Sequence, residues 1–441
     1  MIIRQSVRNR RSKTILGDGV EAARGAATEE CSVAAAAVAA PIPDLSSRHP
    51  LREHNFRLFF TGSTLSLLGD QFYFVALPWL VLQQTGSAIA MGTIMMVGAI
   101  PRAALMLMGG VLTDRISPRR IMTVTAWVRA ILVAGIGLLI WLHLLHTWEL
   151  YALAAAFGSA DAFDAPAGQA FIAYLVKSKQ LVAATSVSEV RTELATIVGP
   201  VPAGFILKEL GLAWAFFIDA ITFLFIIGAL LHLPDPPPAH SVKKPIWHFI
   251  LEGFRYVGKD IPLRSLMLVA VCINFCLAGP MVLGLAFVAK TKFGSPAMLG
   301  MMFASMAAGA LCGALLAGIW KIRRQGIMIL LVALALALLL ASLGILHGRW
   351  SFPAVLFLMG AAAGMANVQI DAWIMQRIDP AVRGRVSSML TLGAMGTVPI
   401  SLALAGLLIA LSLKLMFLVA ASVLLVATMA AAAQKTVRQI Q

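Results

Sequence analysis

The stretch GVLTDRISPRR, residues 110–120, joins two long apolar runs and places one acid and three arginines in a short turn. If the preceding run is a helix, the carboxylate of Asp114 stands at its C-terminal end, where it opposes the helix dipole. Such a carboxylate needs a cationic partner or the N-terminus of another helix, and Arg115, Arg119 and Arg120 lie close in sequence. An ordinary basic loop on the inner side of a membrane explains these arginines, but not the Gly-x-Leu-x-Asp spacing that starts at Gly110. We therefore expect a functional turn.

The apolar composition of the chain decides its class. Hydrophobic residues make up 60% of the 441 residues and charged residues only 12%, which excludes an ordinary soluble globule. A spanning helix needs about 20 mainly apolar residues, and twelve such runs follow one another. We place them at 57–82, 89–112, 120–142, 149–175, 183–207, 212–233, 263–289, 297–320, 326–346, 351–376, 386–410 and 413–433. The sequence therefore predicts an all-α membrane protein with twelve transmembrane helices.

The net charge of +15 is explained by its distribution and not by a nucleic-acid partner. Basic residues cluster in alternate loops, at 115–120, 177–179, 243–264, 321–324 and 383–385. The intervening loops carry only Lys208, Lys290, Lys292, Arg349 and Lys414. By the positive-inside rule, the basic loops face the cytoplasm. We expect a protein of the cell inner (plasma) membrane with both termini cytoplasmic.

The runs divide into two halves with tails. Residues 1–50 form a basic, alanine-rich cytoplasmic tail that we expect to be disordered, although the alanines around residue 38 leave open a cleaved signal peptide. An N-terminal six-helix bundle, 51–233, precedes a cytoplasmic linker, 234–262, whose apolar positions share one face of an interfacial helix. A C-terminal six-helix bundle, 263–433, and a cytoplasmic tail, 434–441, complete the chain.

The two halves align when the second is shifted by 206 residues, an alignment that chance matching of apolar sequence also permits. Gly158 then meets Gly364, and Asp161 meets Asn367. Two parallel six-helix repeats, with a substrate site between them near the bilayer midplane, are what this pattern predicts.

A proline-rich element in the run 183–207 predicts a bend. Gly199, Pro200, Ala203 and Gly204 combine small residues, which allow close helix packing, with a proline that interrupts the backbone hydrogen bonds. A packing kink without a role in transport is the alternative interpretation.

Two of these elements resemble signatures of one family. Residues 110–120 resemble the loop between the second and third helices of major facilitator superfamily transporters, with Ser117 and Pro118 in place of the usual glycine and first basic residue. Residues 199–204 resemble the Gly-Pro-x-x-Gly-Gly element of exporters, with Ala203 in place of one glycine. Together with Leu-Gly-Asp at 68–70, FIAYLV at 171–176 and Arg-Gly-Arg-Val at 383–386, they resemble the drug and siderophore efflux branch over about residues 51–433.

The resemblance to this branch, that of macrolide efflux proteins and the enterobactin exporter, implies the major facilitator fold, two parallel six-helix repeats and export. It also places a cytoplasmic gate at the turn. The gate residues are Gly110, Asp114, Arg115, Arg119 and Arg120.

Charged residues within the apolar runs mark a coupling site. An ionised side chain near the membrane centre is costly and normally faces a cavity or a partner. Asp70, Arg102, Arg129, Asp161 and Asp164 all fall near mid-depth in the first half. Asp161 and Asp164 share a helix face, so their repulsion favours one neutral carboxyl unless an arginine intervenes. We expect proton coupling here, with static ion pairs as the alternative.

The second half offers amides in place of charges. Asn274, Asn367 and Gln369 fall within apolar runs and can orient a substrate in the central cavity without titrating.

The sequence favours a transporter over an enzyme. It lacks a phosphate-binding Gly-x-x-x-x-Gly-Lys-Ser/Thr element, its histidines lack metal-ligand spacing, and we expect no catalytic residue, metal or cofactor. We expect a monomer, surrounded by lipids, that exports a small apolar or amphipathic compound (a drug, siderophore or metabolite) by alternating access, driven by the proton gradient. A lipid or lysolipid translocator, a small-molecule importer and a transport-inactive membrane sensor remain as alternatives.

Overall fold

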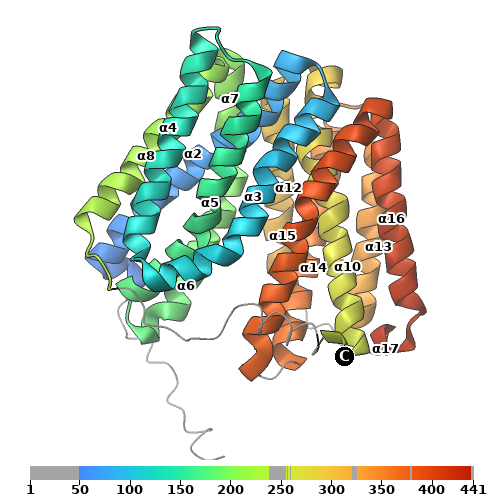
Figure 1. The fold of residues 1–441 in the computed structure, drawn as a ribbon. Coiled ribbons are helices and arrows are strands. Elements are labelled where there is room, and N and C mark those ends of the chain that lie inside the picture. The colour runs from blue at the N-terminus through green and yellow to red at the C-terminus, as the bar shows by residue number, and fades with distance from the viewer. Residues whose placement is uncertain are drawn as a thin grey trace, which may run out of the picture. The chain divides into compact units, whose positions relative to one another are not determined.

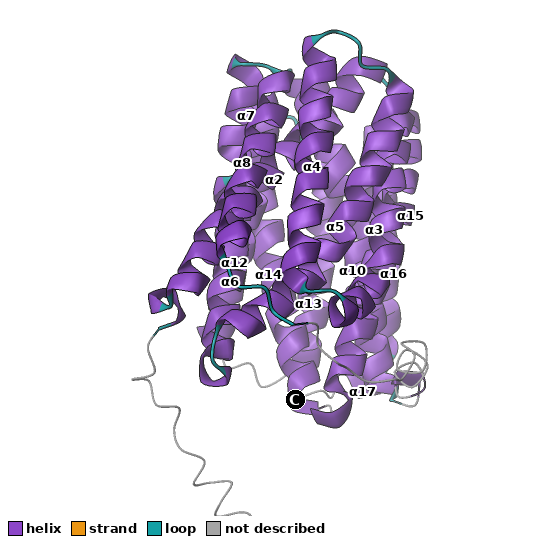
Figure 2. Ribbon diagram, turned by 60° about the vertical axis from the view of Figure 1, so that its left-hand side comes forward, coloured by secondary structure: helices purple, strands orange, loops and turns teal. Residues whose placement is uncertain are grey.

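A computed structural model describes residues 49–237, 255, 257–258, 260–319, 325–377 and 380–438. The side chains at 107, 110–111, 114, 375–376, 380–385, 387–388 and 435–436 lie outside the description, as does nearly all of the expected interfacial helix. Every regular element in the described ranges is helical, as Figure 2 shows.

Each half of the chain contributes six long helices or helix pairs. The first half contains α2 (His54–Thr85), α3 (Ala88–Arg115), α4 (Pro118–Trp141), α5 (Thr147–Leu175), α6 (Leu181–Val198), α7 (Pro200–Glu209) and α8 (Leu212–His232). The second half contains α10 (Ile261–Gly279), α11 (Leu285–Val288), α12 (Pro296–Ile319), α13 (Gln325–Leu343), α14 (Ser351–Arg377), α15 (Pro380–Leu411) and α16 (Leu413–Ala433). A short helix, α17 (Lys435–Arg438), follows and buries Val437.

The twelve expected spans are all present as helices. Eleven of the described helical segments are long and apolar enough to cross a membrane. The twelfth is α5, whose 29 residues include Asp161 and Asp164 within an otherwise apolar stretch. These acids lower its hydropathy, but both are partly buried in α5, which packs against α3 and α4. The expected all-α fold with twelve spans is confirmed.

Two spans contain irregular segments, of which only the one in the fifth span is expected from the sequence. The fifth breaks between α6 and α7, because Pro200 and Pro202 cannot donate backbone hydrogen bonds. The seventh contains two π-helical segments, η3 (Pro280–Gly284) and η4 (Ala289–Phe293), on either side of α11. Wider turns of this kind commonly appear where the regular ladder is interrupted, here at Pro280.

The same helix pairs pack together in both halves. In the first half α3 packs on α5, and α4 packs on α8; in the second half α12 packs on α14, and α13 packs on α16 (Figure 1). Gly158 of α5 approaches Gly98 of α3, and Gly364 of α14 approaches Ala310 of α12, so closely that a side chain at either glycine would clash with backbone atoms. The repeated pairing supports two six-helix repeats.

The halves meet at two close helix crossings near one end of the bundle. This end also contains the turns near residues 86 and 294. A Cβ on Gly92 of α3 would lie 2.8 Å from the carbonyl oxygen of Leu402 in α15. A Cβ on Gly204 of α7 would lie 2.6 Å from the carbonyl oxygen of Pro296 in α12. Small residues thus bring the two halves into backbone contact at this end, called here the sealed end.

Candidate functional site

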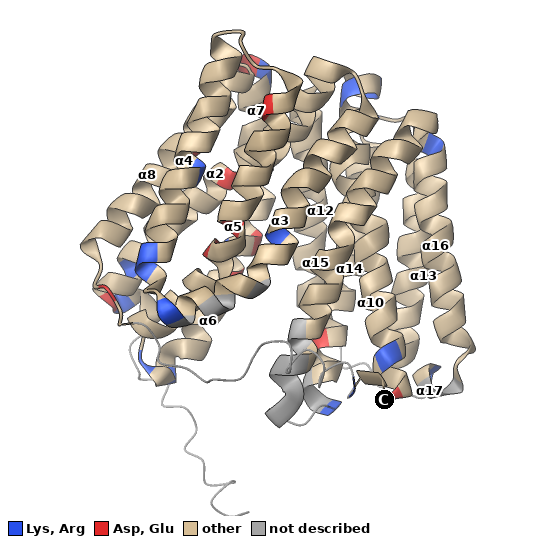
Figure 3. Ribbon diagram, viewed as in Figure 1, with Lys and Arg blue, Asp and Glu red and all other residues tan. Residues whose placement is uncertain are grey.

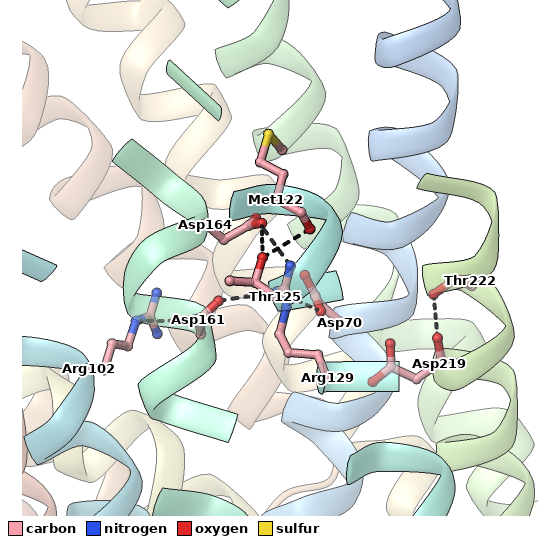
Figure 4. A network of polar contacts seen from close by, with 9 residues as sticks. All are labelled: Asp70, Arg102, Met122, Thr125, Arg129, Asp161, Asp164, Asp219 and Thr222. Atoms are coloured by element: carbon pink, nitrogen blue, oxygen red, sulfur yellow. Dashed lines mark hydrogen bonds and ion pairs between the residues drawn. The ribbon is translucent and has the colours of Figure 1, made fainter. Parts of the chain in front are cut away.

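One buried arginine links three acids from two helices. Arg129 of α4 has a side chain that is only 4% exposed, and it forms ion pairs with α2 and α5 (Figure 4). Its Nη1 lies 3.8 Å from Asp70 Oδ1 and 3.3 Å from Asp161 Oδ1, and its Nη2 lies 3.2 Å from Asp164 Oδ2. A planar guanidinium can hold several carboxylates at once, which a lysine ammonium cannot do with the same geometry.

The network continues from Arg129 toward the other half of the protein. Arg102 Nε of α3 lies 2.9 Å from Asp161 Oδ2, and the Arg102 side chain is 42% exposed. Thr125 Oγ1 donates a hydrogen bond of 3.3 Å to Asp164. Asp161 therefore connects a buried arginine to a half-exposed one. The five charged residues expected at mid-depth come together in one network; their roles in coupling remain a prediction.

A further buried acid lies beside this network and was not expected from the sequence. Asp219 of α8 is fully buried, and within the described structure both of its carboxylate oxygens lack a hydrogen-bond partner. It lies against α2, because a Cβ on Gly69 would be 2.8 Å from Asp219 Oδ1. Its presence in an apolar run is the same signal that identified Asp70, so the sequence could have revealed it.

Carboxyl groups outnumber guanidinium groups in the network. The paired acids are Asp70, Asp161 and Asp164, and the paired bases are Arg102 and Arg129. With every acid ionised, the group would hold a net negative charge inside the membrane-spanning region, which is a costly state. Proton uptake relieves it.

An apolar cavity of about 250 Å³ lies between the halves, beside this network. The first half contributes aromatic rings, including Tyr73, which stacks on Phe157 at 4.0 Å between ring centroids, together with Arg102 and Asp161. The second half contributes only Ala278, Val282, Met395, Val398 and Leu402. An apolar chamber with one ion pair in its wall suits a small apolar or amphipathic molecule.

The amides expected from the second half lie elsewhere. Asn274 of α10 and Asn367 of α14 are exposed, and Gln369 is buried. None of the three lines the cavity beside the ion network. Figure 3 shows the described charges of the second half near the ends of its helices, whereas the first half carries charges near the middle.

The turn at 115–118 is tied to α8. Arg119 donates hydrogen bonds to the carbonyl oxygens of Leu230 (2.6 Å) and Leu231 (3.0 Å), near the C-terminus of that helix. Arg120 Nε and the Ser117 hydroxyl both bond Asp235, and this pairing holds the pKa of Asp235 below its usual range, the Ser117 hydrogen bond being the larger cause. Two of the expected gate arginines therefore have partners, Arg119 at the end of α8 and Arg120 at the start of the linker.

The other gate residues have fewer described contacts. Arg115 is exposed. The structure does not describe the side chain of Asp114 or the surroundings of Gly110. The role of Asp114 in a gate stays a prediction.

The exporter-type element lies at the break in the fifth span. Gly199 approaches the side chain of Gln71 in α2, and Gly204 makes the crossing with α12 at the sealed end. Pro200 and Ala203 are buried between these contacts. The expected close packing occurs here, while Gly199 keeps helical φ and ψ angles of −62° and −41° between α6 and α7.

No group of three potential metal ligands occurs among the described residues.

A family model for transmembrane secretion effectors matches residues 45–441, nearly the whole chain. The chain belongs to this family of major facilitator transporters. The family membership makes the protein a multi-pass membrane transporter of a small molecule and not an enzyme, as its sequence predicts.

Known proteins similar to this chain include two bacterial exporters. The multidrug efflux pump Tap of Mycobacterium tuberculosis is 28% identical over 368 residues, covering 79% of this chain and 85% of Tap. The enterobactin exporter EntS of Shigella flexneri is 26% identical over 348 residues, covering 76% and 80%. A crystal structure of a variant of the nucleoside transporter NupG shares the fold, with a TM-score of 0.71, 12% identity and coverage of 86% and 99%.

Proposed function

We propose that this transporter exports a small apolar or amphipathic compound in exchange for protons. The observation that carries the proposal is Asp161, which lines the apolar cavity and belongs to a buried network with more carboxyl than guanidinium groups. The similarity to a multidrug efflux pump and an enterobactin exporter supports export of such compounds.

Asp161 couples proton binding to substrate binding through Arg102 and Arg129. When Asp161 is ionised, it holds Arg102 at the cavity wall and shares Arg129 with Asp164. When it takes up a proton, Arg102 loses its partner and changes the charge that the substrate meets. A site whose charge differs between two states can link proton release to substrate binding.

Alternating access follows from the positions of the crossings. In this proposal the sealed end faces the outside of the cell, the turn at 115–118 faces the cytoplasm, and the protein lies in the inner (plasma) membrane with both termini cytoplasmic. When the two halves rotate against each other, the crossings at Gly92 and Gly204 separate. The same movement brings Asp114 into contact with the start of α15 and closes the cytoplasmic side. A monomer suffices, because both halves belong to one chain.

The test is accumulation of a panel of compounds in efflux-deficient cells that express the protein, with and without a protonophore. Lower accumulation that the protonophore reverses supports proton-driven export. Raised accumulation would indicate an importer. Export of fluorescent lysolipid alone would indicate a lipid translocator, and no change for any compound would contradict transport of this class.

A further inference from the structure

A second cavity is lined entirely by residues of the first half and borders the ion network. It has a volume of about 260 Å³ and lies among α2, α4, α5, α6 and α8. Its polar lining comprises Ser63, Ser66, Gln169, Ser188 and Thr192, together with charged groups of the network. No residue lines both cavities.

The ion network borders both cavities. Asp161 and Arg102 face the apolar cavity, whereas Asp70, Arg129 and Asp164 face the polar one. Asp161 and Asp164 are one helical turn apart on α5 and share Arg129. A change of charge on the polar side therefore reaches the apolar side through one guanidinium.

Among the described residues, buried polar groups beside the polar cavity lack hydrogen-bond partners that water could supply. Arg129 is nearly fully buried, yet its Nε lacks a hydrogen-bond partner within the described structure, as does the Nε of Arg191. Buried polar groups of this kind are normally satisfied by ordered water, and the cavity has both the volume and the polar lining to hold several molecules.

Glu189 of α6 lines the same cavity and is exposed, so it connects the cavity to the outside of the bundle. The charged groups that face the cavity are Asp70 of α2, Arg129 of α4, Asp164 of α5, and Glu189 and Arg191 of α6. From α8 the cavity receives only Ile226, while Asp219 lies beyond Asp70.

We propose that the polar cavity is a water-filled proton route, separate from the substrate route, with Glu189 at its mouth. A proton passes from Glu189 through water to Asp164 or Asp70, and the shared Arg129 transmits the change of charge to Asp161. The substrate never enters this route. The inference rests on the proposed proton coupling and names the path that the proton takes.

Gly168 of α5 offers a direct test, because it lines the polar cavity and a Cβ there would meet only Met122, at an ordinary 3.7 Å. We expect Gly168→Leu to fill the route and slow proton-driven export about tenfold in everted vesicles. Binding of the best-exported panel compound should be unchanged. The matched control is Gly135→Leu, since Gly135 of α4 faces open space.

Wild-type export by Gly168→Leu would overturn the separate route. If export by the wild-type protein does not depend on the proton gradient, the proposed function itself is contradicted. The failure of the separate route and the failure of proton coupling are therefore distinguishable.

Thiol labelling tests the route without substrate and without relying on activity. In a variant that lacks the four native cysteines, Ser66→Cys reports on the polar cavity and Ala99→Cys on the apolar cavity. We expect a charged methanethiosulfonate reagent to label Ser66→Cys, and Gly168→Leu to slow that labelling without affecting Ala99→Cys. Equal slowing at both positions, or no labelling of Ser66→Cys in a folded protein, would contradict the proposal.

Discussion

Asp161 and Arg129 form an ion pair of 3.3 Å inside the first half of the transporter. The other oxygen of Asp161 lies 2.9 Å from Arg102, at the wall of the apolar cavity. One carboxylate thus touches both the buried network and the proposed substrate site. Removal of either partner of a buried ion pair leaves an uncompensated charge, so these contacts are costly to break without a compensating proton.

Asp70→Asn should abolish gradient-driven export and retain substrate binding, because the amide resembles the protonated acid but cannot release a proton. The check is substrate-induced proton movement in everted vesicles at matched expression. Asp371→Asn serves as the control, since Asp371 is an exposed acid in α14 outside the network. Intact proton movement in Asp70→Asn would move the coupling role to Asp161 and Asp164.

Asp219→Asn should leave the melting temperature of the purified protein equal to or above that of the wild type. The substitution removes one buried acid beside a network with excess acids, so it reduces repulsion among buried groups. Thermal unfolding in detergent measures the effect. A loss of stability of about 3 kcal/mol or more would show instead that Asp219 is a required ionised partner of Arg129.

Gly204→Leu should block transport by preventing the crossing of α7 and α12 at the sealed end. The larger side chain would meet the Pro296 carbonyl, which a Cβ alone would approach to 2.6 Å. Transport at matched expression is the measurement. Gly228→Leu is the control, because Gly228 of α8 has open space around it. Wild-type transport by Gly204→Leu would remove the support for this crossing as a gate.

Asp235→Asn should lower thermal stability modestly, by about 0.5 kcal/mol once solvent screening of this exposed pair is considered. Folding lowers the pKa of Asp235, through the Ser117 hydrogen bond and Arg120. The contribution is therefore present above the unfolded pKa of about 3.9 and is lost as pH falls through the lower folded value. Melting curves between about pH 7 and pH 3 should show the difference shrinking; a difference independent of pH would contradict this assignment. Glu209→Gln, which alters an exposed pair, is the control.

Cysteines at opposite ends of the bundle should react from opposite sides of the membrane. In a cysteine-free variant, Lys179→Cys should be labelled by an impermeant reagent only in everted vesicles, and Lys208→Cys only in intact cells. Both lysines are exposed, so a cysteine at either position can be reached by the reagent from its own side of the membrane. Labelling of Lys179→Cys in intact cells would reverse the proposed orientation.

The helices, the depth of the charged residues and the proline break could be predicted from sequence, because each depends on residues that are close together in the chain. The twelve helices follow from runs of about 20 apolar residues, since a bilayer requires that length whatever the neighbouring helices are. The mid-depth positions of Asp70, Arg102, Arg129, Asp161 and Asp164 follow from counting along those runs. The break at Pro200 follows from a missing backbone donor, whereas the π-helical turns near Pro280 were not anticipated.

Sequence alone therefore determined the class of protein, its helices and the residues that carry charge inside them. Only the tertiary structure decided that Arg129 pairs with Asp70, Asp161 and Asp164 together, because those contacts depend on how α2, α4 and α5 rotate and cross. It likewise brought in Asp219 and separated a polar cavity from an apolar one. Helix formation is set by neighbours in sequence, whereas cavities and ion networks are set by side chains from distant segments that pack together.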